Sequence, residues 1–195
     1  RHFLSRESVK IQGKIFPING AKMGFVPSTP ITMFITAVRP RMLQLGGEIG
    51  DGVLLSAGCA PGYIRRCADE IVLGAQRVGK PAKDVDIAGF VTAAVSDSAK
   101  EAIEANKQFL AYIFRNVHHA ENLRLGGNKI DQEGLAAAVG KRDWEAAKKY
   151  ISDDIVFAHS VAGTPSDCAK QIEEFTKGGL DLPIVLPTGT QEARN

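Results

Sequence analysis

Four short apolar runs, separated by longer stretches with helical spacing, constrain the fold of this chain more than any other feature. The runs cover Ile31–Ala37, Val53–Leu55, Val85–Ala94 and Leu182–Leu186. Short runs that are apolar throughout, without polar alternation, are typical of strands buried on both faces, as in a parallel sheet. The alternation of such strands with helices therefore predicts an α/β fold built on a parallel sheet.

The helices between these runs have recognisable starts. Proline at the first helical position and a Ser or Thr just before it are common helix-start signals. Ser98 and Glu101 also have the spacing of a capping box. The expected helices start at Pro40, Pro61, Ser98 and Thr164–Pro165, with two shorter ones over Asp131–Val139 and Trp144–Ile151.

The number of strands is small for a closed α/β fold. A complete eight-stranded barrel takes about 250 residues, whereas this chain has 195 residues and four expected strands. The sequence from Arg1 onward predicts the end of a helix followed by a short hairpin. We therefore expect a TIM-barrel-type sheet of about four parallel strands, equivalent to half a barrel. Its open edges and apolar inner face predict a covering partner, either the missing half or another copy.

Composition narrows the class of protein. The net charge is +2 with acids and bases interspersed, which argues against a nucleic-acid-binding face. No apolar run approaches the roughly 20 residues of a membrane span, and the start shows no signal-peptide pattern. The three cysteines, Cys59, Cys67 and Cys168, form no CxxC pair, so neither a disulfide framework nor a zinc site is expected. A reducing cytoplasm is the expected location.

The turn after the first expected strand is the best candidate for an anion site. Thr36–Arg41 carries Arg39 and Arg41 around Pro40, where a helix begins. A helix N-terminus offers free N–H groups and a positive dipole end, and guanidinium groups suit phosphate oxygens. The alternative is a solvated turn whose arginines pair with nearby carboxylates.

Other polar residues offer weaker candidates. Ser56–Cys59 follows the second strand at the same expected rim, and Pro187–Gly189 follows the last one. Cys59 has no base near it in sequence, so a nucleophilic role is not expected. His118 and His119 are consecutive and would point different ways, while His159 lies in an apolar run and is expected to be partly buried and hydrogen-bonded. No GxSxG elbow, GxGxxG fingerprint or P-loop is present.

Several segments together resemble a known family. They are "PITMFITAVRPRMLQLGGEIGDGVLLS", "DVDIAGFVTAAVSDSAKEA", "AGTPSDCAKQIEEF" and "GGLDLPIVLPTG". These resemble the bacterial-luciferase-like superfamily of α/β-barrel oxidoreductases, and within it the methylene-tetrahydromethanopterin reductases that use the deazaflavin coenzyme F420. The resemblance covers about Ser8 to Gly189. It implies that residues 1–195 form the C-terminal half of a (β/α)8 barrel with a helical insertion at about 112–160.

The resemblance also implies a cofactor site. In that family the turn matching Ala37, Val38, Arg39, Pro40 and Arg41 approaches the phosphate-bearing tail of the cofactor, with the rim at Ser56 and Gly58 close by. This chain departs from the family at Arg39, where glycine is common. A side chain there would either add a phosphate contact or block the close approach of the backbone. No catalytic acid or base is carried over, and no metal ligand is expected.

The function implied by the resemblance is hydride transfer between F420 and a small substrate such as methylene-tetrahydromethanopterin. The protein would position and seal the cofactor, because the hydride chemistry belongs to the cofactor. Two alternatives stay open. The same fold could use FMN with oxygen as a monooxygenase, or the half-barrel could be an inactive fragment or assembly module.

Overall fold

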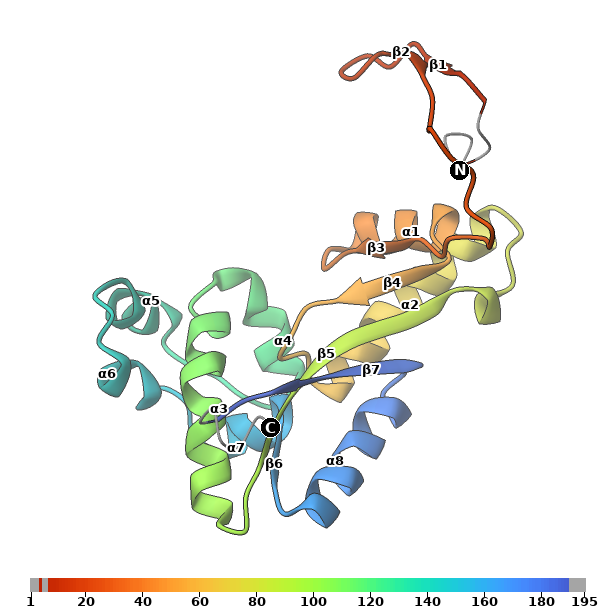
Figure 1. Cartoon of the computed structure of the whole chain (residues 1–195). Helices are drawn as coiled ribbons and strands as arrows, with labels where there is room; N and C mark the ends of the chain where they lie inside the picture. Colours follow the sequence, from red (N-terminus) through yellow and green to blue (C-terminus); the bar gives the residue numbers. More distant parts are fainter. Residues whose placement is uncertain (1–3, 5–6, 190–195) are drawn as a thin grey trace. The chain divides into compact units, whose positions relative to one another are not determined.

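The computed structural model describes residue 4 and residues 7–189 (Figure 1). The chain divides into two compact units, Arg1–Met33 and Phe34–Asn195. The described part of the first unit is an antiparallel hairpin of β1 (Val9–Ile11) and β2 (Ile18–Ala21). This confirms the short hairpin expected near the start of the chain. The expected helix tail falls on residues 1–6, of which the structure describes only residue 4.

The second unit is built on a five-stranded parallel sheet. Its strands are β3 (Phe34–Thr36), β4 (Gly52–Leu55), β5 (Asp86–Val95), β6 (Val161–Gly163) and β7 (Leu182–Pro187). Ala88 of β5 pairs with both Leu54 and Leu182, so β4 and β7 lie along opposite edges of β5. Ala93 pairs with both Val161 and Pro187, so β6 continues the edge that β4 begins. The α/β fold with a parallel sheet is confirmed.

Two strands differ from expectation. The run Ile31–Ala37 yields only the short strand β3, because the register with β4 covers Phe34–Thr36, and Ile31 is exposed. The strand β6 was not expected, which makes the prediction of four strands wrong by one. It directly follows a helix within a single apolar run and pairs only with the end of β5, so periodicity does not separate it from its neighbour.

The long helices begin where the sequence predicts. They are α1 (Pro40–Ile49), α2 (Pro61–Arg77), α3 (Ala99–Phe114) and α8 (Pro165–Lys177). Thr164 and Asp167 form a complete capping box at α8. At α3 only half of the expected box forms: Ser98 accepts from the Glu101 N–H, but the Glu101 carboxylate accepts from the Ser96 hydroxyl.

Shorter helical segments fill the stretch between α3 and β6. They are η3 (Val117–His119), α4 (Ala120–Leu125), α5 (Gln132–Gly140), α6 (Trp144–Lys148) and α7 (Asp153–His159). The helices expected over Asp131–Val139 and Trp144–Ile151 correspond to α5 and α6. A 3-10 turn, η2 (Ala82–Asp84), precedes β5.

Two hydrophobic clusters meet at β5. Val91 and Ala93 belong to a cluster with residues of α2 and α8, whereas Ala94 belongs to a second cluster with α3, α5 and α7. Successive strand residues point to opposite faces, so the second cluster lies on the face that α2 and α8 leave uncovered. Figure 1 shows α3, α5 and α6 to one side of the end of β5 and α8 to the other.

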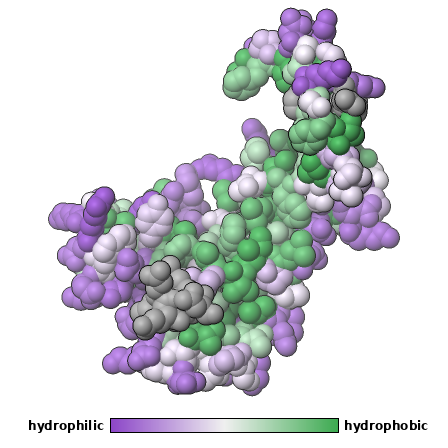
Figure 2. All heavy atoms as spheres, in the orientation of Figure 1, coloured by the Kyte–Doolittle hydropathy of each residue, from purple (hydrophilic) through white to green (hydrophobic). Residues whose placement is uncertain are grey.

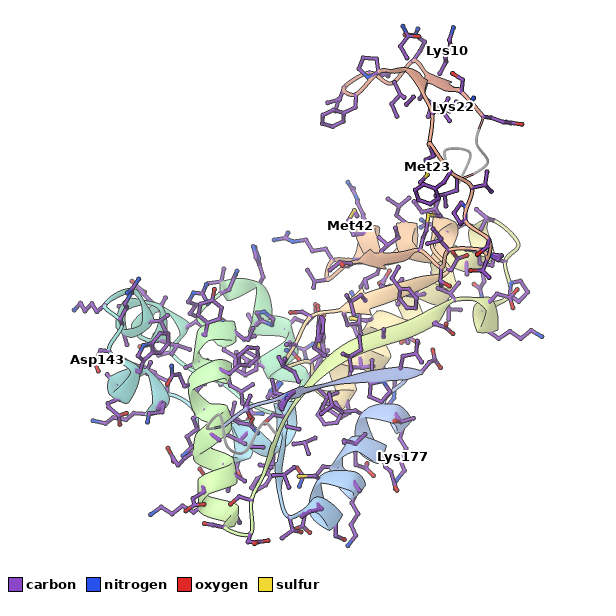
Figure 3. The ribbon with its side chains drawn as sticks, in the orientation of Figure 1. Lys10, Lys22, Met23, Met42, Asp143 and Lys177 are labelled. Atoms are coloured by element: carbon purple, nitrogen blue, oxygen red, sulfur yellow. The ribbon has the colours of Figure 1, made fainter. Side chains whose placement is uncertain are left out.

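The helices α1 and α2 cross in close contact. A Cβ added at Gly74 of α2 would lie 1.9 Å from the carbonyl oxygen of Gln44 in α1, which leaves no space for a side chain. The opposite side of α1 is apolar and open, with Met42 44% and Ile49 52% exposed. Figure 3 labels Met42 among the side chains of this helix.

Candidate functional site

The parallel strands end at one rim of the sheet, and the predicted site residues follow β3 and β4 there. Ala37 is buried, and its N–H donates to the carbonyl of Leu54 over 3.2 Å. This bond extends the pairing of β3 and β4 by one residue, so the turn that follows is anchored to β4. Val38, Arg39, Pro40 and Arg41 are exposed beyond it.

A tyrosine from α2 holds the same turn. The Tyr63 hydroxyl donates to the carbonyl oxygen of Val38 over 2.9 Å, and burial raises the pKa of this hydroxyl, which keeps it protonated as a donor. Arg39 is the N-cap of α1 with no side-chain cap, and Pro40 occupies the first turn. The Arg41 N–H meets no backbone acceptor among the described residues, so the first turn of α1 keeps a free donor.

Arg39 reaches across the rim to a histidine that the sequence analysis set aside. Its Nη2 lies 2.8 Å from Nδ1 of His118 in η3. Because a guanidinium only donates, Nδ1 of His118 is the acceptor. Neither Arg39 nor Arg41 pairs with a carboxylate of a described residue. The solvated turn with arginine–carboxylate pairs is therefore not what the described residues form.

Two fully buried side chains, Asn122 and His159, hold the loop after β4 by hydrogen bonds. The carbonyl oxygen of Gly58 accepts from Asn122 Nδ2 over 2.8 Å and from His159 Nδ1 over 2.9 Å. The Asn122 Oδ1 in turn accepts from the N–H of Ala60 over 2.9 Å. Gly58 has φ of +73°, a conformation that favours glycine. Ser56, at the start of this loop, is partly exposed.

His159 is fully buried rather than partly buried, and burial lowers its pKa to about 4. Its ring is neutral at pH 7 with the proton on Nδ1, since that atom donates to Gly58. Its Nε2 faces the Asn128 amide at 3.4 Å, and Phe114 packs edge-on at 4.8 Å. His159 is therefore a structural donor, which agrees with the expected hydrogen-bonded role. Asn122 was missed, because no local pattern distinguishes it.

The thiols are poorly placed for chemistry. Cys59 is buried, its Sγ donates to the carbonyl oxygen of Ser56 over 3.1 Å, and burial raises its pKa. Burial also raises the pKa of Cys67, to about 12. Both thiols stay protonated at neutral pH, so neither is an activated nucleophile. Within the described residues no group of His, Cys, Asp and Glu is arranged to hold a metal ion.

A groove of about 890 Å³ opens at the carboxyl ends of β5 and β7. Its lining includes Pro187, Thr188 and Gly189, which the sequence analysis placed at this rim, together with residues of α3 and α6. The sequence gives no signal for the groove itself, because its walls combine the end of β5 and α3 with α6 and the end of β7, which lie farther along the chain. No helix among the described residues is long and apolar enough to cross a membrane.

The chain is similar to proteins of a known family. Residues 1–182 match the luciferase-like monooxygenase family. A 5,10-methylenetetrahydromethanopterin reductase of Archaeoglobus fulgidus is 32% identical over 200 residues, covering 100% of this chain and 60% of the relative. An F420-dependent glucose-6-phosphate dehydrogenase of Kribbella flavida is 23% identical, covering 100% of this chain and 54% of the relative.

Solved structures agree with the fold. The coenzyme F420-dependent tetrahydromethanopterin reductase of Methanopyrus kandleri superposes with a TM-score of 0.81 at 28% identity, covering 95% of this chain and 54% of the other. The sheet and its helices match part of that α/β barrel. The chain thus spans between half and three-fifths of the length of these relatives.

Proposed function

Because the chain belongs to the luciferase-like monooxygenase family, we propose that it forms part of an F420-dependent oxidoreductase acting on a one-carbon carrier such as methylene-tetrahydromethanopterin. The observation that carries the proposal is the agreement of three relatives, 29–32% identical, that share the name 5,10-methylenetetrahydromethanopterin reductase. The chain covers 53–60% of their length, so the activity is a property of the whole protein.

The turn Ala37–Arg41 is the proposed binding site for the cofactor's phosphate. Arg39 and Arg41 are exposed cations that pair with no carboxylate of a described residue, and the Arg41 N–H in the first turn of α1 donates to no described backbone acceptor. A phosphate oxygen satisfies such donors and favours the positive end of the helix dipole. Pro40 contributes no donor but fixes the backbone angle at which the helix begins.

The rim at Ser56 and Gly58 is the proposed second contact. The Ser56 hydroxyl bonds to no residue that the structure describes, so it is available to a ligand. Gly58 is held in place through its carbonyl by Asn122 and His159. When bound, F420 would supply hydride transfer. The chain's own residues would supply charge, orientation and a fixed backbone.

FMN-dependent chemistry is the second candidate, favoured by the description of the family as luciferase-like monooxygenases. Both cofactors carry a phosphate, so the turn Ala37–Arg41 does not discriminate between them. The relatives at 22–23% identity are also named as F420-dependent enzymes, which favours the deazaflavin.

The open sheet edges support a partner. Within the described residues β3 pairs only with β4, and β7 only with β5. Leu182, Ile184 and Val185 of β7 are 40–49% exposed, and Figure 2 shows hydrophobic side chains in a band along the strands. Exposed apolar edge strands pair readily with another chain. We propose that the remainder of the whole protein, or another copy of this chain, covers them.

Cofactor binding tests the proposal directly. Purified protein is titrated with F420 and, separately, with FMN, and binding is read from the change in cofactor fluorescence. We expect F420 to bind more tightly, and binding of neither cofactor would refute the proposal. Arg39→Gly restores the family residue and is expected to weaken F420 binding about 5-fold or more, since a charge-assisted bond is lost. Unchanged or tighter binding would show that Arg39 is not a ligand.

Arg77→Ala is the matched control. Arg77 is an exposed arginine in the last turn of α2, and its removal changes the net charge equally. We expect F420 binding to be unchanged. A loss equal to that of Arg39→Gly would assign the effect to overall charge rather than to the turn.

A further inference from the structure

The groove at the carboxyl ends of β5 and β7 is separate from the turn proposed for the cofactor phosphate, and none of Ala37–Arg41 or Ser56–Gly58 lines it. Its volume of about 890 Å³ lies within the range of small-molecule sites, about 300–1,000 Å³. Ala94 and Leu186 are among its lining residues. Ala94 belongs to the cluster on the face of β5 that α2 and α8 leave uncovered.

The floor of the groove is fixed by hydrogen bonds. The Thr188 N–H donates to the carbonyl oxygen of Ala93 over 2.9 Å, and the Thr188 hydroxyl donates to Oδ1 of Asn106. Asn106 is fully buried and donates from Nδ2 to the carbonyl oxygen of Val161 over 2.8 Å. These bonds tie α3 to β6 and to the end of β7. The groove therefore exists before a ligand arrives, which lowers the entropic cost of binding.

Aromatic side chains form its walls. Phe109 and Tyr112 lie three residues apart on α3, and Trp144 begins α6. Tyr112 is 48% exposed, and the guanidinium of Arg115 lies 3.7 Å from its ring centroid and covers one face of the ring. A ligand would therefore contact the other face or the edge of Tyr112. Flat rings stack on such surfaces in offset or edge-on arrangements. The walls therefore suit a planar ligand.

Unused hydrogen-bonding groups accompany these rings. The Gln108 amide, the Tyr112 hydroxyl and the Trp144 indole N–H bond to no residue that the structure describes. Among the charged side chains, Glu101 and Glu104 lie in the lining, and Lys148 pairs with Glu145. This set offers both donors and acceptors without excess positive charge, unlike the arginine-bearing turn. It suits a neutral ring with several nitrogens rather than a phosphate.

We propose that this groove binds the planar, nitrogen-containing ring of the substrate, with Tyr112 and Trp144 stacking on it and Gln108 bonding to its edge. The assignment to the substrate rests on the proposed function, whereas the binding of a planar heterocycle does not. The groove and the turn Ala37–Arg41 both lie at the carboxyl ends of the parallel strands. The substrate ring and the cofactor phosphate would therefore bind at different parts of the same rim.

Trp144 is the single tryptophan of the chain, so tryptophan fluorescence reports on this groove directly. The 195-residue chain is titrated with 6-hydroxymethylpterin as the planar heterocycle and with glucose 6-phosphate as the phosphorylated sugar. We expect saturable quenching of Trp144 by the pterin and no change with the sugar. Quenching by the sugar alone, or by neither compound, overturns the proposal.

Matched variants separate stacking from general effects. Tyr112→Leu is expected to weaken pterin binding about 3- to 10-fold, the range of a lost aromatic contact. Phe157→Leu removes an equally exposed ring, 48% in both cases, from α7 outside the groove lining, and is expected to leave binding unchanged. Equal weakening by both variants, or by neither, would contradict the assignment, provided that circular dichroism shows both variants folded.

The two proposals fail differently. Loss of F420 binding in the whole protein, with pterin quenching retained, would refute the proposed function and keep the groove as a heterocycle site. F420 binding without pterin quenching would leave the proposed function standing and remove the groove from it.

Discussion

The buried ring of His159 donates a hydrogen bond from Nδ1 to the carbonyl oxygen of Gly58 over 2.9 Å, although 101 residues separate them in sequence. The bond joins the end of α7 to the loop after β4. Asn122 donates to the same oxygen, so the loop at the rim is held by the helical segments between α3 and β6. Its backbone geometry depends on two side chains that touch no solvent.

Replacing His159 with alanine should destabilise the fold. The substitution leaves a cavity beside Phe114 and removes one of two donors to Gly58, and we expect a loss of about 2–4 kcal/mol in the free energy of unfolding. Urea denaturation followed by circular dichroism measures it. His118→Ala, at an exposed position, is the control and should change stability by less than about 0.5 kcal/mol. Equal losses would contradict the structural role of His159.

The same histidine should make stability fall at mildly acidic pH. Its pKa is about 4 in the folded protein and 6.5 as the reference value, so the unfolded state binds more protons between these values. Its contribution to stability is complete above about pH 6.5 and is lost as the pH falls toward 4, by about 3 kcal/mol at most. Unfolding free energies at pH 5 and 7.5 measure this, and His159→Gln should reduce the difference. An unchanged difference in the variant would assign the acid sensitivity elsewhere.

Tyr63→Phe tests the support of the arginine-bearing turn. The substitution removes only the hydroxyl that donates to Val38, so we expect a loss of about 0.5–1.5 kcal/mol in stability. Because Val38 precedes Arg39, the proposed cofactor contact should also loosen and F420 binding weaken. Isothermal titration calorimetry of the whole protein measures the binding. Unaltered binding would show that the turn keeps its conformation without Tyr63.

The crossing of α1 and α2 should tolerate no side chain at Gly74. A methyl group there would meet the carbonyl of Gln44, and the helices would have to separate, at a cost of about 1–3 kcal/mol. Gly140→Ala at the end of α5 is the matched control, since a Cβ there meets nothing within 4 Å. The control should be neutral or stabilising by up to about 1 kcal/mol. Thermal unfolding of both variants distinguishes them.

The cysteines should be unreactive in the folded protein. Cys59, Cys67 and Cys168 are all buried, and burial raises the pKa of each thiol. A thiol-specific chromogenic reagent at pH 7.5 should label none of them until urea is added. Rapid labelling of one thiol in native buffer would show that its surroundings open locally.

Much of the local structure followed from the sequence alone. Pro40, Pro61 and Thr164–Pro165 start helices because proline and capping side chains act within one turn. Short apolar runs marked four of the five strands of the parallel sheet, because strands of such sheets are apolar over a short local window. β4 and β5 are largely buried, whereas Leu182, Ile184 and Val185 of β7 are exposed. The family followed from longer motifs, and the match over residues 1–182 confirms it. The cofactor contacts at Ala37–Arg41, Ser56 and Gly58 stay predictions.

Only the tertiary structure decided which distant residues form hydrogen bonds with one another. Arg39 and His118 are 79 residues apart, Asn106 and Thr188 are 82 apart, and Gly58 and His159 are 101 apart. A hydrogen bond depends on distance and direction in space, and periodicity carries neither between distant segments. The short strand β6 also depends on tertiary contacts. Its three residues form a strand because their backbone pairs with the end of β5. The sequence therefore determined the elements and their order, whereas packing decided the supports of the rim and the shape of its groove.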